Sequence, residues 1–245
     1  MSYSIVIPTL WVPQGMQRQL LALTAHPLVT EVLIINNRTA ATPDWAVLAD
    51  PKIRRLDQAA NIYVNPAWNL GVAQARCELI CLLNDDINFD LSVFDFLLDK
   101  VSAEQGIYGL NMMDESPSLS LSPVVDRCWG FGCLMVFHRD SYLPIPHALK
   151  ILYGDDYLFS RNRSRGRENF VINGVANDRE VSATMSSDLV AKTAEFRLLR
   201  KVETQYWDRL NPPGFFNVPA YLKRGWRRWL LRLRRLVAHL SGKSS

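Results

Sequence analysis

A short apolar segment that ends in an acidic turn places the tightest limit on what this chain can fold into. Residues 79–83 read Leu-Ile-Cys-Leu-Leu without a polar break, and Asn84, Asp85 and Asp86 follow directly. Five residues are too few for a helix that holds itself, and they do not alternate between polar and apolar positions. The pattern is typical of a strand buried on both faces of a mostly parallel sheet. The sequence therefore predicts an α/β fold with this strand at its centre.

Asp85 and Asp86 come where an open α/β sheet binds its ligands, just past the carboxyl end of a strand. Two neighbouring carboxylates repel each other unless a cation lies between them and a ligand. Mg²⁺ and Mn²⁺ prefer oxygen ligands and are often held by one or two carboxylates together with substrate phosphates. We therefore expect a metal–diphosphate site with Asp86 and Asp85 as metal ligands. The alternative is a solvated acidic turn that caps a helix starting near Leu91.

The segments before the central strand alternate between expected strands and an expected helix. Residues 4–9 predict a buried strand that ends at Pro8 and Thr9, and residues 16–25 predict a helix. Residues 31–39 predict a second strand with a polar, turn-prone end, and residues 50–56 a short third one. Strand, helix and strand in this order form the βαβ unit of a nucleotide-binding sheet. The first strand is not followed by a glycine-rich phosphate loop, which disfavours a dinucleotide-binding or P-loop protein.

Residues 61–75 predict a helix with Asn65 as its N-cap and Pro66 in its first turn. Asn69 and Gly71 then lie inside this helix, although both residues are poor helix formers. Such a cost indicates either a ligand contact or a glycine that lets the helix approach the sheet. The sequence leaves both interpretations open.

Taken in order, these segments resemble the nucleotide-sugar half of a GT-A glycosyltransferase and are most similar to glycosyltransferase family 2. The resemblance covers residues 1–185, and Asn84 replaces the first Asp of the family's Asp-x-Asp motif. It implies a Rossmann-like GT-A fold, which is a mostly parallel central sheet flanked by helices. It also implies a nucleotide diphosphate sugar donor, a glycan acceptor and Mg²⁺ or Mn²⁺ as cofactor. The motifs that carry it are Pro8-Thr9, Asn36-Asn37, Asn61, Asn69-Leu70-Gly71 and Asn84-Asp85-Asp86.

The resemblance further implies which residues bind the nucleotide sugar. They are Pro8, Thr9, Asn36, Arg38, Asn61, Asn69, Asn84, Asp85, Trp129 and Gly130. The last two belong to a segment, residues 129–133, in which glycines flank aromatic side chains before an apolar strand at 134–137. This composition allows the close approach of a flat ligand such as a sugar ring. A bulged strand that packs its aromatic residues into the core is the alternative.

A second acidic pair, Asp155 and Asp156, opens an expected helix that ends near Arg163. Carboxylates in the first turn of a helix are favoured by the helix dipole, so capping alone would explain them. The functional interpretation is a general base, because inverting glycosyl transfer needs a carboxylate that takes the proton of the acceptor hydroxyl. The resembling family carries an acidic pair here, which implies Asp156 as the catalytic base and Asp155 as its orienting neighbour. Four arginines follow, which either bind an anion or form a solvated basic loop: Arg161, Arg163, Arg165 and Arg167.

The rest of the body shows one departure from the family. Ser182-Ala183-Thr184 resembles a Ser-x-Thr motif, but many relatives place a metal-binding His just before it, where this chain has Asn177 and Asp178. The third protein ligand of the metal is therefore open. The remaining expected elements are an amphipathic helix at 91–104, a strand at 106–110, a surface loop at 111–125, a strand at 169–175 and a helix at 187–210.

The basic residues are concentrated near the end of the chain. Residues 211–245 contain eight Lys and Arg and no Asp or Glu, whereas the whole chain has 28 basic and 24 acidic residues. Tyr221 to Leu240 predict a basic amphipathic helix with tryptophan and leucine on its apolar face, which suits an anionic membrane interface. A docking helix for a partner protein and a nucleic-acid contact are the alternatives. We favour the membrane surface and expect no nucleic-acid partner.

The cysteines and the start of the chain bear on the compartment. Cys77, Cys81, Cys128 and Cys133 form no Cys-x-x-Cys pair, which disfavours zinc and favours buried thiols in a reducing compartment. We recognise no signal peptide and no apolar run of transmembrane length. The sequence therefore predicts a cytoplasmic protein that is attached peripherally to the inner face of a membrane.

The expected organisation is a GT-A domain at residues 1–210 and a membrane-associating tail at 211–245. Within the domain, residues 1–110 form the nucleotide-sugar half and residues 111–210 the acceptor half. The resemblance implies a metal-dependent hexosyl- or related sugar transferase, inverting, in the synthesis of a cell-surface polysaccharide such as an O-antigen or capsule. One alternative is a nucleotidyltransferase, which would usually carry a basic glycine-rich loop after the first strand. The other is a non-catalytic membrane-bound scaffold of the same fold.

Overall fold

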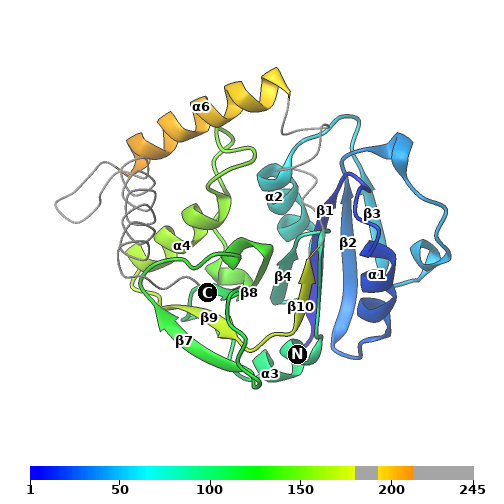
Figure 1. Cartoon of the computed structure of the whole chain (residues 1–245), viewed down its shortest axis with the longest axis horizontal. Coiled ribbons are helices and arrows are strands. Elements are labelled where there is room, and N and C mark those ends of the chain that lie inside the picture. The colour runs from blue at the N-terminus through cyan, green and yellow to red at the C-terminus, as the bar shows by residue number, and fades with distance from the viewer. Residues whose placement is uncertain (180–192, 212–245) are drawn as a thin grey trace, which may run out of the picture.

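Four parallel strands form the first half of a central sheet in the computed structural model, which describes residues 1–179 and 193–211 of the chain (Figure 1). The order is β3-β2-β1-β4, with β1 between β2 and β4. Every side chain of β4 is buried, which confirms the central strand expected from its uninterrupted apolar run. The bounds are β1 (Tyr3–Thr9), β2 (Val29–Asn36), β3 (Ile53–Asp57) and β4 (Leu79–Leu83).

The second half of the sheet continues from β4 in the order β8-β6-β9-β7. Strand β8 runs antiparallel to both β4 and β6, β6 is parallel to β9, and β7 is antiparallel to β9. The result is an eight-stranded, mostly parallel sheet flanked by helices, so the α/β fold class is confirmed. The bounds are β6 (Tyr108–Leu110), β7 (Ser120–Val124), β8 (Leu134–His138) and β9 (Asn169–Asn173).

Helices cover both faces of the sheet, and the alternation of β1 shows how. Ile5 and Ile7 pack with α1 (Met16–Ala25) and α3 (Ser92–Leu97), whereas Val6 packs with α2 (Val64–Gln74) and α4 (Gly154–Ser164) on the other face. The last described helix, α6 (Ala194–Leu210), lies across α4 and the start of α2, where Tyr63 donates to Glu195 (Figure 1). A small separate ribbon pairs β5 (Ile87–Phe89) with β10 (Asn177–Arg179) in antiparallel register.

Helix α2 differs from its prediction at the start and agrees with one interpretation of its glycine. The helix begins at Val64 with Tyr63 as N-cap, so the expectation that Asn65 is the N-cap was wrong. Asn65 instead lies in the first turn, and its amide donates to the carbonyls of Leu149 and Leu152. A Cβ atom at Gly71 would come 2.2 Å from Val6 Cγ1. Gly71 therefore allows the close approach of α2 to β1.

Three other elements also differ from expectation. Helix α3 ends at Leu97 instead of continuing to residue 104, although Val101 still reaches the core in the turns that follow. The expected loop at 111–125 contains the half-exposed edge strand β7. Helix α6 begins at Ala194 with Thr193 as its N-cap, whose side chain accepts a hydrogen bond from Phe196 N, so the helix expected at 187–210 does not run through residue 193.

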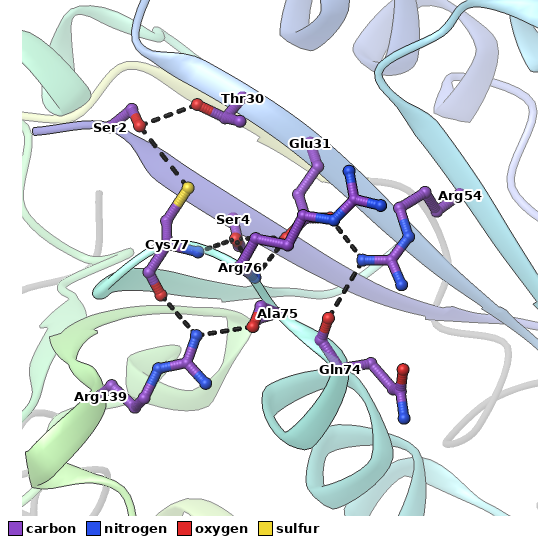
Figure 2. A network of polar contacts seen from close by, with 10 residues as sticks. All are labelled: Ser2, Ser4, Thr30, Glu31, Arg54, Gln74, Ala75, Arg76, Cys77 and Arg139. Carbon is purple, nitrogen blue, oxygen red and sulfur yellow. Dashed lines mark hydrogen bonds and ion pairs between the residues drawn. The ribbon is translucent and has the colours of Figure 1, made fainter.

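A buried carboxylate holds the edge of the sheet where the parallel strands begin (Figure 2). Glu31 on β2 accepts hydrogen bonds from Ser4 Oγ at 2.7 Å, from Arg54 at 2.6 Å and from the backbone N–H of Arg76 at 2.6 Å. Arg139 donates to the carbonyls of Ala75 and Cys77 in the same network. These contacts tie three strands and the end of α2 together at the edge opposite the acidic residues.

Several expectations fall outside the described residues: the Ser182-Ala183-Thr184 motif, residues 187–192 and the basic amphipathic segment 221–240. Within the described residues, no helix is long and apolar enough to cross a membrane. All four cysteines are described, and no disulfide joins them.

Candidate functional site

The site begins where the ends of β1 and β4 meet. Because the two strands are parallel neighbours, the residues after their carboxyl ends come together at one edge of the sheet. The hydroxyl of Thr9 donates to Asp85 Oδ2 at 2.6 Å, and it accepts from the N–H of Trp11 at 2.8 Å. These two hydrogen bonds fix the direction of the chain after β1 and hold it beside the first acidic pair, Asp85 and Asp86.

The first acidic pair carries more negative charge than its surroundings favour. Asp86 is 3% exposed and Asp85 is partly buried. Burial and the charge of Asp86 raise the pKa of Asp85 to about 7, against hydrogen bonds from Thr9 and from the N–H of Leu10 that lower it. A cation at this position would relieve the repulsion between the carboxylates.

The donor set fits Mg²⁺ or Mn²⁺ held jointly with phosphates. Within residues 1–179 and 193–211, no three His, Cys, Asp or Glu side chains form a ready metal cage. Mg²⁺ commonly takes only one or two protein carboxylates and completes its shell with water and substrate phosphate. Strand β10 pairs with β5 directly after Asp86, and Asn177 and Asp178 lie opposite Phe89 and Asn88. A third protein ligand from this segment stays a prediction.

The residues expected to bind the nucleoside differ in how far the protein itself occupies their polar groups. Pro8 lies near the end of β1, and Arg38 is exposed after β2. The Asn36 amide is saturated by the protein: its oxygen accepts from Trp11 Nε1 at 2.7 Å, and its nitrogen donates to Thr42 and Asp57. The Asn36 side chain therefore holds Trp11 in place, and a contact of Asn36 with a nucleoside stays a prediction.

Trp11 was not predicted from the sequence. Its backbone adopts a φ of 60°, and its ring packs edge-on against Trp45 at 5.8 Å. Positive φ is uncommon for a bulky residue and often marks a functional turn. The only sequence signal was the aromatic residue two positions after the end of a strand.

The two asparagines at helix α2 make scaffold contacts. Asn61 Oδ1 accepts from the N–H of Tyr63 at 2.9 Å, which forms the turn before the helix. Asn69 Oδ1 accepts from Tyr142 Oη and from Ile145 N, and Asn69 Nδ2 donates to Ile145 O. The polar atoms of Asn69 thus hold the loop before α4, and contact with a nucleotide sugar stays a prediction for both residues.

The glycine-rich segment 129–133 connects the first acidic pair with the second, Asp155 and Asp156. The N–H of Asn84 donates to the carbonyl of Cys133 at 3.0 Å. On the neighbouring residue, a Cβ atom at Gly132 would lie 2.5 Å from Asp155 Oδ2. Gly130 has a φ of 85°, and the Trp129 side chain is 56% exposed. The segment therefore brings both acidic pairs to the same edge of the sheet.

The second acidic pair lies in the first turn of α4, as predicted, and both carboxylates contact Arg127. Arg127 Nη1 is 2.7 Å from Asp155 Oδ2. Its Nε and Nη2 donate to the two oxygens of Asp156 at 2.9 and 3.0 Å. Burial raises the pKa of Asp155, opposed by Arg127 and assisted by the charge of Asp156. Arg127 was missed in the sequence because a single arginine in a polar loop carries no motif.

A carboxylate on α6 fixes the loop that leads into this turn, and it was also missed. Glu203 is fully buried and accepts hydrogen bonds from the N–H groups of Lys150, Ile151 and Leu152. The next residue, Tyr153, stacks on Trp207 at 5.3 Å and adopts a φ of 61° as the N-cap of α4.

The four arginines near the end of α4 lie about two helical turns beyond the acidic pair. Arg161 lies over the ring of Tyr157, Arg163 donates to the carbonyl of Val125, and Arg167 donates to the carbonyl of Asp140. Arg165 is exposed. These contacts favour the interpretation of a solvated basic surface over that of a diphosphate site.

Comparisons with known proteins show likeness in structure. A crystal structure titled S. aureus TarS 1-349 matches with a TM-score of 0.54 and 11% identity, over 85% of this chain and 71% of that one. A second crystal structure of S. aureus TarS matches with a TM-score of 0.51 and 13% identity, over 85% of this chain and 43% of that one. No model of a protein family matches the chain, and no curated protein does. At these identities the likeness shows the fold alone, which is GT-A-like.

Proposed function

We propose that the protein is a glycosyltransferase that moves a sugar from a nucleotide diphosphate sugar to a glycan acceptor. One observation carries the proposal: both acidic pairs lie at the carboxyl-end edge of the parallel strands and are joined through residues 129–133. Ligands of open α/β sheets bind at this edge. The Asp85–Asp86 pair has the oxygen atoms to hold a cation on a diphosphate. The Asp155–Asp156 pair supplies a carboxylate for proton transfer.

The donor half of the site would use the ends of β1 and β2. Pro8, Thr9 and Arg38 would border the nucleoside, and Asn36 would fix Trp11 beside it. Asp86 and Asp85 would hold Mg²⁺ or Mn²⁺, which when bound supplies positive charge to the diphosphate leaving group. Trp129 and the adjacent glycines would shape the sugar site.

The acceptor half would use the first turn of α4. The acceptor hydroxyl oxygen forms a bond to the anomeric carbon while the bond from that carbon to the diphosphate oxygen breaks. The nucleoside diphosphate leaves with the bonding electrons, and the hydroxyl proton passes to Asp156. Attack opposite the leaving group inverts the anomeric centre. Asp156 suits this role because its side chain is 30% exposed, compared with 19% for Asp155.

We place the reaction in the synthesis of a cell-surface polysaccharide on a lipid-linked acceptor at the cytoplasmic face of a membrane. The eight basic residues of 211–245 support attachment to an anionic lipid surface. Removing the chain after Pro219 should release the protein from anionic liposomes in a sedimentation assay. Co-sedimentation of the truncated protein would show that the attachment lies elsewhere.

The donor assignment is tested by thermal unfolding with a panel of nucleotide diphosphate sugars, in Mg²⁺ or Mn²⁺ and again in chelator. We expect one donor to raise the melting temperature only with metal present. Asp86→Ala should lose this shift, whereas the control Asp99→Asn should keep it, because the Asp99 side chain is 79% exposed and pairs with Lys100. An unchanged shift in Asp86→Ala would remove the metal assignment. No shift across the panel would count against the donor class and favour the scaffold alternative.

A further inference from the structure

The contacts of Arg127 use every nitrogen of its guanidinium. Nη1 meets Asp155 Oδ2 at 2.7 Å, while Nε and Nη2 donate side by side to the two oxygens of Asp156. Bidentate pairing of this kind fixes a carboxylate in its plane as well as neutralising its charge. A lysine at this position would carry the charge without the planar fork.

The guanidinium balances a cluster that has an excess of negative charge. Asp155, Asp156 and Arg127 are 19%, 30% and 29% exposed in their side chains. Among the described residues, the thiol of Cys128 also acts on the Arg127 guanidinium. Without Arg127, two adjacent carboxylates would face each other in a partly buried turn. Two neighbouring carboxylates in partly buried surroundings repel each other, so one of them retains its proton to a higher pH.

The backbone around Arg127 is held on both sides. Arg163 donates to the carbonyl of Val125, two residues before it. Cys128 follows Arg127 directly, and its thiol donates to the carbonyl of Leu110 at 3.3 Å. The guanidinium is therefore presented to α4 from a tethered segment.

The two carboxylates differ in what surrounds them. Asp155 Oδ1 accepts from the N–H of Asp156 at 3.0 Å, and Oδ2 contacts Arg127 beside the backbone of Gly132. Among the described residues, each oxygen of Asp156 accepts one hydrogen bond, from Arg127. A carboxylate oxygen can accept two, so Asp156 retains capacity for a hydroxyl donor.

We propose that Arg127 is a positioning residue that holds the Asp155–Asp156 pair ionised and in one orientation, so that Asp156 receives the acceptor proton. This inference rests on the proposed function for the identity of the proton donor. The hold of Arg127 on the pair is a property of the protein alone and can be measured without any substrate.

The test compares Arg127→Gln with the control Arg165→Gln. Arg165 is exposed and lies at the end of α4, the helix that carries the Asp155–Asp156 pair in its first turn. Aspartate carboxyl carbons labelled with ¹³C are titrated by NMR, and Asp155→Asn and Asp156→Asn assign the two signals. We expect the titration of the pair in Arg127→Gln to move up by about one to three pH units. The control should titrate as the wild type does. A pair that titrates unchanged in folded Arg127→Gln would overturn the proposal.

Activity gives a second readout. In Arg127→Gln, the acid limb of the pH profile of kcat/KM should move to higher pH together with the carboxylate titration. Guanidinium ion in solution should restore part of the rate. Arg127→Lys covers the case in which the glutamine variant does not fold. It should keep the titration near that of the wild type and lower kcat about tenfold, because a lost charge-assisted hydrogen bond commonly changes an equilibrium or rate by this much. A wild-type kcat in Arg127→Lys would contradict the role of the planar fork.

The outcomes separate the two proposals. If the titration moves but the wild type transfers no sugar, the proposed function fails and the hold of Arg127 on the pair stands. If the wild type transfers sugar but neither the titration nor the acid limb moves in Arg127→Gln, the function stands and the Arg127 proposal fails.

Discussion

The hydroxyl of Thr9 donates a 2.6 Å hydrogen bond to Asp85 Oδ2, although the two residues are 76 positions apart in the chain. The bond joins the end of β1 to the acidic turn after β4. It also favours the ionised form of Asp85, whose pKa is raised to about 7 by burial and by Asp86. Thr9 thus links the first strand to the protonation state of a proposed metal ligand.

Thr9→Val is expected to raise the pKa of Asp85 further, because the hydrogen bond to the carboxylate is lost. Near pH 7 a larger fraction of Asp85 is then protonated, so the affinity for Mn²⁺ and donor should fall about tenfold. The deficit should narrow at about pH 8.5, where Asp85 is more fully ionised in both proteins. Calorimetric titration at the two pH values measures this. Thr9→Ser keeps the hydroxyl and serves as the control, and an equal deficit at both pH values would contradict the explanation.

Gly71→Ala is expected to destabilise the protein by about 1–3 kcal/mol. A Cβ atom at this position would lie 2.2 Å from Val6 Cγ1, so α2 must move away from β1. This cost exceeds the helix propensity gained with alanine, about 1 kcal/mol. Chemical denaturation gives the free energy of unfolding. The double variant Gly71→Ala/Val6→Ala should recover part of the lost stability. If Gly71→Ala alone is as stable as the wild type, the contact with Val6 does not set the spacing between α2 and β1.

Glu203→Ala is expected to lower the free energy of unfolding by about 3 kcal/mol, because it leaves three N–H groups of residues 150–152 without their acceptor. The same N–H groups should exchange faster with deuterium, and the first turn of α4 should loosen with them. Gln205→Ala, at an exposed position on α6, is the control. Unchanged exchange at residues 150–152 would mean that Glu203 does not hold this loop.

Glu31 should make stability depend on acid pH. Burial opposes its ionisation, but hydrogen bonds from Arg54, Ser4 and the N–H of Arg76 outweigh burial and lower its pKa below the ordinary 4.5. A lowered pKa contributes stability that is present above the pKa of the unfolded chain and is lost as pH falls through the folded value. The difference in unfolding free energy between wild type and Glu31→Gln should therefore shrink below about pH 4.5.

Denaturant titrations at about pH 7, 4 and 3 would measure that difference. Glu168→Gln, at an exposed glutamate, is the control. A Glu31→Gln gap that is constant over this range would place the stabilising effect of Glu31 in packing instead of in charge.

The sequence predicted the sheet best where burial leaves a local signature. The run at 79–83 is apolar at every position because both faces of β4 are covered, and a surface helix or a loop would interrupt such a run with polar residues. Strand β7 lies at the edge of the sheet, where half-exposed Ser and Pro residues look like a loop. The start of α2 was misplaced because Tyr63 adopts a φ of 68°, which sequence preferences would not assign to tyrosine.

The acidic residues of the candidate site were found from local pattern, but their partners were not. Arg127 is 29 positions from Asp156, and Glu203 is 51 positions from Leu152. Contacts over such separations depend on the path of the whole chain, which a single sequence does not reveal. Asn69 shows the reverse case, since its motif suggested a ligand contact and its amide is used to hold a loop.

The most direct measurement is sugar transfer by the wild type and by Asp156→Asn, with the donor identified by thermal stabilisation. Release of nucleoside diphosphate is followed with lipid-linked and free glycans as acceptors. We expect metal-dependent transfer by the wild type. In Asp156→Asn we expect unchanged donor binding and a transfer rate at least about a hundredfold lower. Transfer by Asp156→Asn at the wild-type rate would show that the Asp156 carboxylate does not accept the proton.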